Sequence, residues 1–138
     1  MEENLVFLKL SKGYDDKSIR ELSPLALAFL GDGVYELLVR TYVLDKNKLA
    51  NKLHKEAVNF VKAKAQSESI RRVLSKLSED EKAVFNRGKN AKPHTMAKNQ
   101  TTFDYKMATG LEALFGYLYL LNRGDRILEL FKLMGEIE

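Results

Sequence analysis

Cysteine is absent from the 138 residues of this chain. Without thiols the protein has neither a disulfide framework nor a thiolate metal site, and this composition fits a reducing compartment. The two histidines, His54 and His94, are too far apart in the sequence to give a zinc-binding spacing. Neither histidine has a partner at short range, so nucleophilic catalysis by a side chain is not indicated.

Long hydrophobic runs are also missing. The two most apolar stretches are interrupted by Asp32, Glu36 and Glu112, so neither is expected to span a membrane. Residues 1–10 carry acidic side chains where a secretory signal peptide carries basic ones. We therefore expect a cytoplasmic protein that has no membrane partner.

Acidic residues are absent from residues 82–103, although the whole chain carries 19 of them. The basic residues of this segment are Lys82, Arg87, Lys89, Lys92 and Lys98. The net charge of +4 is therefore concentrated here, and the rest of the chain is close to neutral. A local positive field of this kind favours a polyanionic partner. Chance clustering on an ordinary solvated surface remains the alternative.

Apolar residues recur at helical spacing along most of the chain, and no segment shows a confident strand pattern. A break is expected near residues 66–69, Gly88 is expected to end a helix, and residues 88–100 form one long irregular segment. The fold class that follows is all-α, a helical bundle in a single domain over residues 1–138. Ser23 suits a helix cap and Pro24 the first turn, and Ser78 with Glu81 is expected to form a capping box. The expected helices cover residues 16–22, 24–44, 48–77, 78–87, 101–121 and 125–134.

The expected helix over residues 24–44 contains an unusual polar interruption. Asp32 lies between Gly31 and Gly33, in the middle of an otherwise apolar helix. Each interior glycine costs about 0.5–1 kcal/mol relative to alanine, and a carboxylate in apolar surroundings costs more unless something pairs with it. The pattern therefore predicts a close backbone approach, and a need for negative charge, at this point of the helix.

A second apolar helix, over residues 106–121, repeats the pattern. Glu112 lies near its middle, with Gly110 on one side and Gly116 on the other. We expect the two helices to pack closely, with Asp32 and Glu112 facing each other. Two unpaired carboxylates would repel, so that one would keep its proton. A divalent cation between them would remove the repulsion, and a salt bridge from each to Lys or Arg is the alternative.

Carboxylate oxygens in small number are ligands that suit Mg²⁺, which keeps several of its waters. Bound Mg²⁺ polarises a phosphodiester and activates a water molecule, so that no histidine base is needed. Beside a basic surface, this pair of carboxylates indicates a metal-dependent nuclease.

A row of polar side chains in the expected 48–77 helix offers a second surface for a polyanion. Lysines at this spacing lie along one side of a helix, where a phosphate backbone can lie across them. The alternative is an ordinary exposed helix face, and the sequence does not separate the two. The members of this polar row are Lys48, Lys52, Lys55, Asn59, Lys62 and Gln66.

Two segments resemble the motifs of a known family. Residues 27–36, LAFLGDGVYE, resemble the LEFLGDxxLE motif of ribonuclease III catalytic domains. Residues 109–120, TGLEALFGYLYL, resemble their DxxEAxxGAxYL motif. The motifs follow in the expected order, and the resemblance extends over nearly the whole chain. Residues 87–92, RGKNAK, also resemble the basic loop of the short members of this family, which consist of the catalytic domain alone.

The resemblance implies an all-α homodimer that cuts both strands of an RNA duplex with Mg²⁺, with one site in each subunit. It makes Asp32 and Glu112 the catalytic residues and the metal ligands, and it places Phe29 at the dimer interface. For the short members it also implies maturation of the 23S ribosomal RNA precursor, with a ribosomal protein as a candidate helper. Without a double-stranded-RNA-binding domain, the catalytic domain itself must hold the duplex. The residues expected to contact RNA are Arg87, Lys89, Asn90, Lys92, Lys98, Lys55 and Lys62.

Two departures from the family pattern leave alternatives open. The longer members carry two further acidic residues at the positions of Ala28 and Thr109. The number of metal ions and the rest of their coordination are therefore open. Glu36 is a candidate to join the metal site through a water molecule; the alternative is that it forms a surface or interface salt bridge. Also open is a non-catalytic RNA-binding or ribosome-associated protein with a decayed site. A helical protein-interaction module, whose carboxylates only pair with basic residues, is the third interpretation.

Overall fold

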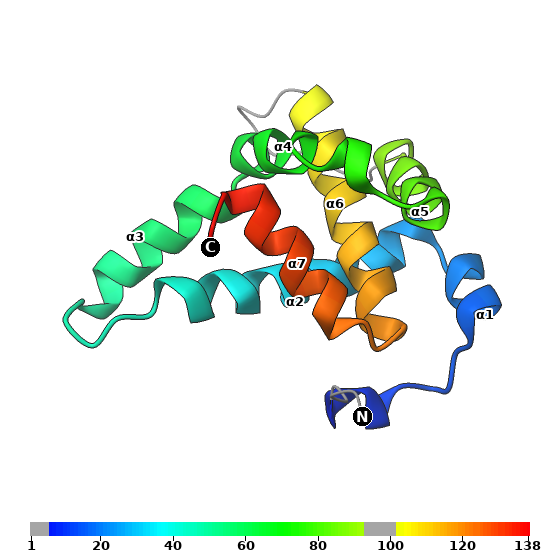
Figure 1. Cartoon of the computed structure of the whole chain (residues 1–138), viewed down its shortest axis with the longest axis horizontal. Coiled ribbons are helices and arrows are strands. Elements are labelled where there is room, and N and C mark those ends of the chain that lie inside the picture. The colour runs from blue at the N-terminus through cyan, green and yellow to red at the C-terminus, as the bar shows by residue number, and fades with distance from the viewer. Residues whose placement is uncertain (1–5, 93–101) are drawn as a thin grey trace.

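The computed structural model describes residues 6–92 and 102–138, and within these residues it contains helices and no strand. Figure 1 shows the helices packed as a bundle, which confirms the all-α prediction. No helix in the described part of the chain is long and apolar enough to cross a membrane. In chain order the elements are the 3₁₀ helix η1 (Val6–Leu10), α1 (Asp16–Glu21), α2 (Pro24–Val43), α3 (Ala50–Val61), α4 (Ala63–Arg71), the 3₁₀ helix η2 (Leu74–Lys76), α5 (Glu79–Lys89), α6 (Thr102–Leu120) and α7 (Gly124–Gly135).

Helix α6 is the centre of the bundle. More than half of its residues are buried, and its apolar side chains are spread over all of its faces. A helix of this kind must be covered on every side. Helices α2, α4, α5 and α7 provide the cover, as Figure 1 shows. The composition of α6 therefore explains its central position.

Helix α2 begins where the sequence predicts. The Ser23 hydroxyl accepts hydrogen bonds from the backbone N–H groups of Leu25 and Ala26, at 3.2 and 3.4 Å, and Pro24 occupies the first turn. A cap of this type satisfies N–H groups that the helix itself leaves without partners. Helices α2 and α3 then run together to one side of the bundle (Figure 1).

The break in the expected 48–77 helix lies at Lys62, so the predicted position near residues 66–69 is wrong. Lys62 has an extended backbone, with φ −66° and ψ 151°, which ends α3 and starts α4. The change of direction lets α4 pack across α6 and buries Gln66. Since the break carries neither glycine nor proline, tertiary packing accounts for it rather than local preference.

Gly88 lies inside α5, so the prediction that it ends the helix is wrong. A Cβ at this position would come within 2.7 Å of the Cβ of Ala113 and 3.1 Å of the Cα of Gly110. Glycine therefore lets α5 pack closely against α6. The helix continues to Lys89, and most of the predicted irregular segment lies outside the described residues.

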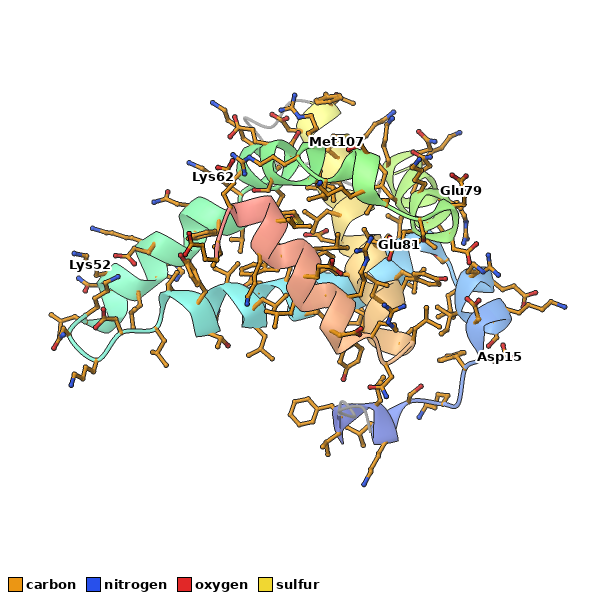
Figure 2. All side chains as sticks on the ribbon, in the orientation of Figure 1. Asp15, Lys52, Lys62, Glu79, Glu81 and Met107 are labelled. Atoms are coloured by element: carbon orange, nitrogen blue, oxygen red, sulfur yellow. The ribbon has the colours of Figure 1, made fainter. Side chains whose placement is uncertain are left out.

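A buried ion pair joins α7 to the start of α5. Ser78 and Glu81 form the predicted capping box, and the Glu81 carboxylate also accepts hydrogen bonds from Arg126 at 2.8 and 2.9 Å. Burial alone would raise the pKa of Glu81, but the Arg126 guanidinium and the Ser78 N–H hold that pKa below its usual range. Figure 2 shows Glu81 between the helices, whereas Glu79 points outward from α5.

Candidate active site

Gly31 of α2 and Gly116 of α6 form a close backbone contact between these two helices. A Cβ on Gly31 would lie 1.6 Å from the carbonyl oxygen of Glu112. A Cβ on Gly116 would lie 2.2 Å from the carbonyl oxygen of Leu27. Any side chain at either position would push the helices apart, so the prediction of close packing is confirmed.

The other two glycines beside the carboxylates have different roles. No heavy atom lies within 4 Å of a Cβ built on Gly33, so the prediction of a close approach is wrong for this residue. Gly110 packs against α5, where a Cβ would lie 2.7 Å from the ring of Phe85. Of these four glycines, Gly31 and Gly116 are therefore the two that allow the close approach of α2 and α6.

The contact of α2 with α6 brings Asp32 and Glu112 together. Burial, followed by the charge of Asp32, raises the pKa of Glu112 to about 8. Asp32 is open to solvent on one side, yet partial burial and the charge of Glu36 raise its pKa as well. Hydrogen bonding between the two side chains raises the pKa of Glu112 further and offsets part of the rise in the pKa of Asp32. Two facing carboxyls behave in this way, because the charge of one disfavours ionisation of the other.

Neither carboxyl of this pair forms an ion pair with Lys or Arg among the described residues. Glu36, one turn after Asp32, does form one: its Oε1 lies 3.2 Å from Nη2 of Arg40. The structure therefore contains the salt bridge that was one of the two alternatives for Glu36. The charge of Glu36 still raises the pKa of both Asp32 and Glu112.

Gln66 is a third residue at this site, and its presence there was not predicted from the sequence. Its side chain is 2% exposed, and its Nε2 donates to the carbonyl oxygen of Val61 at 2.7 Å and to Oε2 of Glu112 at 3.4 Å. Its predicted place in the exposed polar row is therefore wrong, because the break at Lys62 turns α4 inward. The sequence does contain a signal for close packing of α4, because the small residues Ala63, Ala65 and Ser67 lie around Gln66 in the sequence.

The donor atoms at the site fit a hard cation. Two carboxyl groups in contact offer oxygen ligands, and Mg²⁺ bound by one or two carboxylates keeps several waters. Ala28 and Thr109 are buried, and the Thr109 hydroxyl donates to the carbonyl of Tyr105 at 2.9 Å. In the described part of the chain, no three or more His, Cys, Asp or Glu side chains are grouped to hold a metal ion. A cation here would thus have at most two carboxyl ligands from the described residues.

Arg87 is engaged within the protein. Its guanidinium donates to the carbonyl oxygen of Arg20 and, at 3.0 Å, to that of Leu22. These bonds fasten α5 to the link between α1 and α2. Arg87 is nevertheless exposed, and a guanidinium has five N–H donors, so its predicted contact with RNA stays a prediction.

The other candidate RNA contacts after α5 are more open. Lys89 is half-buried at the end of the helix. Asn90 and Lys92, which follow it, are both exposed. Lys98 lies outside the described residues.

The candidates on α3 also face solvent. Lys55 is exposed, and Figure 2 shows Lys52 and Lys62 projecting away from the bundle. Lys48 does not belong to this row, because it precedes α3 and its Nζ pairs with Oε1 of Glu56 at 2.8 Å. The polar row expected from the sequence therefore shortens to the four side chains Lys52, Lys55, Asn59 and Lys62.

Phe29 lies on the solvent side of α2, where its side chain is 84% exposed. Leu37 is eight residues further along the helix and is 61% exposed. Residues at this spacing share one helix face. The α2 helix thus presents an apolar stripe that nothing in the described chain covers.

Residues 25–123 match the family model described as Ribonuclease III domain. The chain belongs to the ribonuclease III family. The match includes both motif segments, and so the two helices that bring Asp32 and Glu112 together. Membership of this family makes the chain an endoribonuclease.

Several relatives carry the name Mini-ribonuclease 3. The one from Clostridium tetani is 48% identical over 127 residues, which cover 91% of this chain and 84% of the relative. The one from Thermoanaerobacter sp. is 43% identical over 139 residues, which cover 99% of this chain and 98% of the relative. The ribonuclease III-family chain described here thus matches Mini-ribonuclease 3 proteins over most of their length.

A solved structure supports the fold. The crystal structure of a protein from Fusobacterium nucleatum superposes with a TM-score of 0.78 at 36% sequence identity. The superposition covers 86% of this chain and 95% of that one. The all-α bundle is therefore shared with an experimentally determined relative.

Proposed function

We propose that this ribonuclease III-family protein is a Mg²⁺-dependent endoribonuclease that cleaves double-stranded RNA, with the 23S ribosomal RNA precursor as its natural substrate. The observation that carries the proposal is the contact between Asp32 and Glu112 where α2 crosses α6. The name Mini-ribonuclease 3 of the relatives supports RNA cleavage. The ribosomal RNA part rests on the resemblance to the short members of the family.

In this proposal Asp32 and Glu112 hold the Mg²⁺ ion and are the catalytic residues. Bound there, Mg²⁺ supplies a Lewis acid for the phosphodiester and lowers the pKa of a coordinated water. The chain contributes a fixed pair of carboxyls, because the glycine contact sets the distance between their helices. Glu112 would hold the cation in its deprotonated form. Asp32 is open to solvent, so a phosphate of RNA could reach the pair from its side.

The RNA surface that we propose combines two groups of residues that solvent can reach. Lys55 and Lys62 come from the α3 side, and Lys89, Asn90 and Lys92 lie close together in sequence at the end of α5. A-form RNA is held largely through its phosphates and 2′-hydroxyls, which such side chains contact. Lys98 stays a prediction from the sequence. Arg87, which is exposed near the end of α5, also belongs to this surface, although two of its N–H donors are engaged within the protein.

A homodimer is also part of the proposal. The exposed Phe29 and Leu37 lie on one face of α2, and Leu37 borders an apolar hollow of about 410 Å³ between α2 and α7. Exposed apolar surface of this kind is unfavourable in water and is typical of an interaction site. A second copy of the chain would cover it, in line with the predicted role of Phe29.

Three further parts of the proposal come from the sequence. They are a single domain over residues 1–138, a cytoplasmic location, and a ribosomal protein that helps to present the RNA. The lack of cysteine supports a reducing compartment.

A second candidate function is RNA binding without catalysis. Its basis is the uncharged pair Ala28 and Thr109, which stands where the longer family members carry acids. The site then has fewer carboxylates than those members have. The resemblance to the short members, which also lack these acids, weighs against this second function.

Cleavage of a perfectly paired RNA duplex separates the two functions. The parent and Asp32→Asn are compared with and without Mg²⁺, and Glu68→Gln, an exposed carboxylate on α4, is the matched control. We expect the parent and the control to cut only with Mg²⁺, and Asp32→Asn to bind the duplex without cutting it. A parent that binds this duplex and precursor ribosomal RNA but cuts neither would favour the second function. Cutting by Asp32→Asn at the parent rate would remove Asp32 from the catalytic site.

A further inference from the structure

Gln66 is one of the buried polar residues in the described part of the chain. It lies on α4, its side chain is 2% exposed, and its amide contacts two other helices. The Nε2 donates to the carbonyl oxygen of Val61, the last residue of α3, at 2.7 Å, and to Oε2 of Glu112 on α6 at 3.4 Å. One side chain thus links the end of α3, the start of α4 and the candidate active site.

The orientation of this amide is determined by its partners. A backbone carbonyl only accepts hydrogen bonds, so the group 2.7 Å from Val61 must be the nitrogen. The same nitrogen then presents its second hydrogen to Glu112. The Oε1 of Gln66 is buried and has no hydrogen-bond partner among the described residues.

A buried amide oxygen without a partner costs free energy. A methionine would fill a similar volume without burying that oxygen, so packing does not account for glutamine at this position. A glutamate would add a third carboxylate and would not donate when ionised. Glutamine is the residue of this length that offers two N–H donors without a charge. The feature that distinguishes it here is therefore the pair of donated hydrogen bonds.

We propose that Gln66 is a positioning residue: its amide, anchored on the Val61 carbonyl, holds the Glu112 carboxyl in the orientation that faces Asp32 and so supports cation binding. This inference rests on the proposed function and deepens it, because it assigns a role at the site to a third helix. The 3.4 Å contact is long, as hydrogen bonds around active sites often are before the ligand binds. Partners that orient metal-binding side chains commonly change metal affinity or activity by about 10–100-fold.

The test is a titration of RNA-free protein with Mn²⁺, which stands in for Mg²⁺ and is followed by its paramagnetic resonance signal. Gln66→Met keeps the length of the side chain and removes both donors. We expect its Kd for Mn²⁺ to rise by about 10–100-fold. Ser67→Ala is the matched control, since the Ser67 hydroxyl is also buried on α4 and has no hydrogen-bond partner among the described residues. It should bind Mn²⁺ as the parent does.

Cleavage kinetics give the second measurement. In Gln66→Met, kcat for a paired RNA duplex should fall at fixed Mg²⁺ while KM stays near the parent value, and excess metal should restore part of kcat. Gln66→Asn keeps an amide that is one methylene too short to reach both partners. Its kcat and its Kd for Mn²⁺ should lie between those of the parent and Gln66→Met. If the methionine variant does not fold, Gln66→Asn is compared with the parent in its place.

Each result decides the inference. Weaker Mn²⁺ binding in the Gln66 variants but not in Ser67→Ala supports it. Equal Mn²⁺ affinity and equal kcat in parent and folded Gln66 variants would make Gln66 a packing residue only, and the proposed function would stand. Equal weakening by Ser67→Ala would assign the effect to α4 packing and overturn the role of the amide. If the parent binds no Mn²⁺, the metal site of the proposed function fails, and this inference fails with it.

Discussion

Glu112 combines burial with a like-charged neighbour, and its proton links the site to solution conditions. Burial and the charge of Asp32 raise the pKa of Glu112 from an ordinary value of 4.5 to about 8. At neutral pH the metal-free protein therefore keeps a proton on Glu112. A cation bound to this carboxylate must displace that proton, so cation binding should tighten as the pH rises.

We predict that the free energy of unfolding of the metal-free protein falls as the pH rises from about 5 to about 8. The pKa of Glu112 is higher in the folded state, so the folded protein binds more protons than the unfolded chain across this window. Glu112→Gln removes this titration, and its stability should vary less with pH. Urea unfolding in the presence of EDTA measures both slopes. Parallel pH profiles for the two proteins would contradict the raised pKa.

At the scale of helices, the distance between α2 and α6 depends on one glycine from each. Gly31 and Gly116 let the backbones touch, and this contact brings carboxyls from two distant parts of the sequence together. A site built on two helices is held more rigidly than one built on loops. The chemistry is therefore sensitive to changes at residues that carry no functional group.

Gly31→Ala is predicted to lower the free energy of unfolding by about 1–3 kcal/mol or more. The added Cβ would fall 1.6 Å from the Glu112 carbonyl oxygen, so α2 must move away from α6. Gly33→Ala is the matched control on the same helix, with no atom within 4 Å of its Cβ. It should raise the free energy of unfolding by roughly 0.5–1 kcal/mol. Urea denaturation compares the two; similar stabilities would argue against the close crossing.

At the scale of the whole molecule, exposed positive charge and exposed apolar surface have separate uses. The lysines on the α3 side are proposed for RNA, and the apolar stripe of α2 is proposed for a second copy of the chain. Arg87, by contrast, is a basic residue that the fold itself uses. Position and partners thus distinguish side chains that the sequence makes equivalent.

The double variant Lys55→Gln and Lys62→Gln should make RNA binding less sensitive to salt. The slope of the logarithm of the binding constant against the logarithm of the salt concentration should become shallower by about two, because each phosphate that a lysine no longer neutralises contributes roughly 0.9. Binding of a labelled RNA duplex without Mg²⁺, followed by fluorescence anisotropy, measures this slope. Lys17→Gln, at an exposed lysine on α1, is the matched control, and it should leave the slope unchanged. A salt slope unaltered in the double variant would exclude these lysines from the RNA surface.

Phe29→Ser is predicted to convert the proposed dimer to a monomer that remains folded, because the ring is 84% exposed in the single chain. Leu49→Ser is the control, since Leu49 is 78% exposed but lies outside α2. Sedimentation velocity measures the state of both variants. If the Phe29→Ser protein forms dimers to the same extent as the Leu49→Ser protein, Phe29 does not belong to the dimer interface.

Much of this arrangement follows from local patterns in the sequence. The position of α2 is predicted by Ser23 and Pro24, and the contact between Asp32 and Glu112 is predicted by glycines in two apolar helices. These features can be predicted from the sequence because their energetic effects are local: a cap stabilises the start of a helix, and an interior glycine destabilises a helix unless something requires it.

Other features depend on tertiary packing, which leaves little trace in the sequence. Nothing local distinguishes Gly31, which contacts Glu112, from Gly33, beside which a Cβ would meet nothing. The break at Lys62 carries no glycine or proline, and it is this break that moves Gln66 from an exposed row to the active site. The internal role of Arg87 depends likewise on carbonyl groups more than sixty residues away in sequence.

The central claim is that Asp32 and Glu112 together hold a divalent cation, and crystals grown with Mn²⁺ test it most directly. Anomalous scattering from Mn²⁺ locates the ion without reference to any assumed site. We predict a peak between the two side chains, within about 2.5 Å of an oxygen of each, near the distance of a metal–oxygen bond. A well-ordered crystal at saturating Mn²⁺ with no peak there, or with the ion bound elsewhere, would contradict the claim.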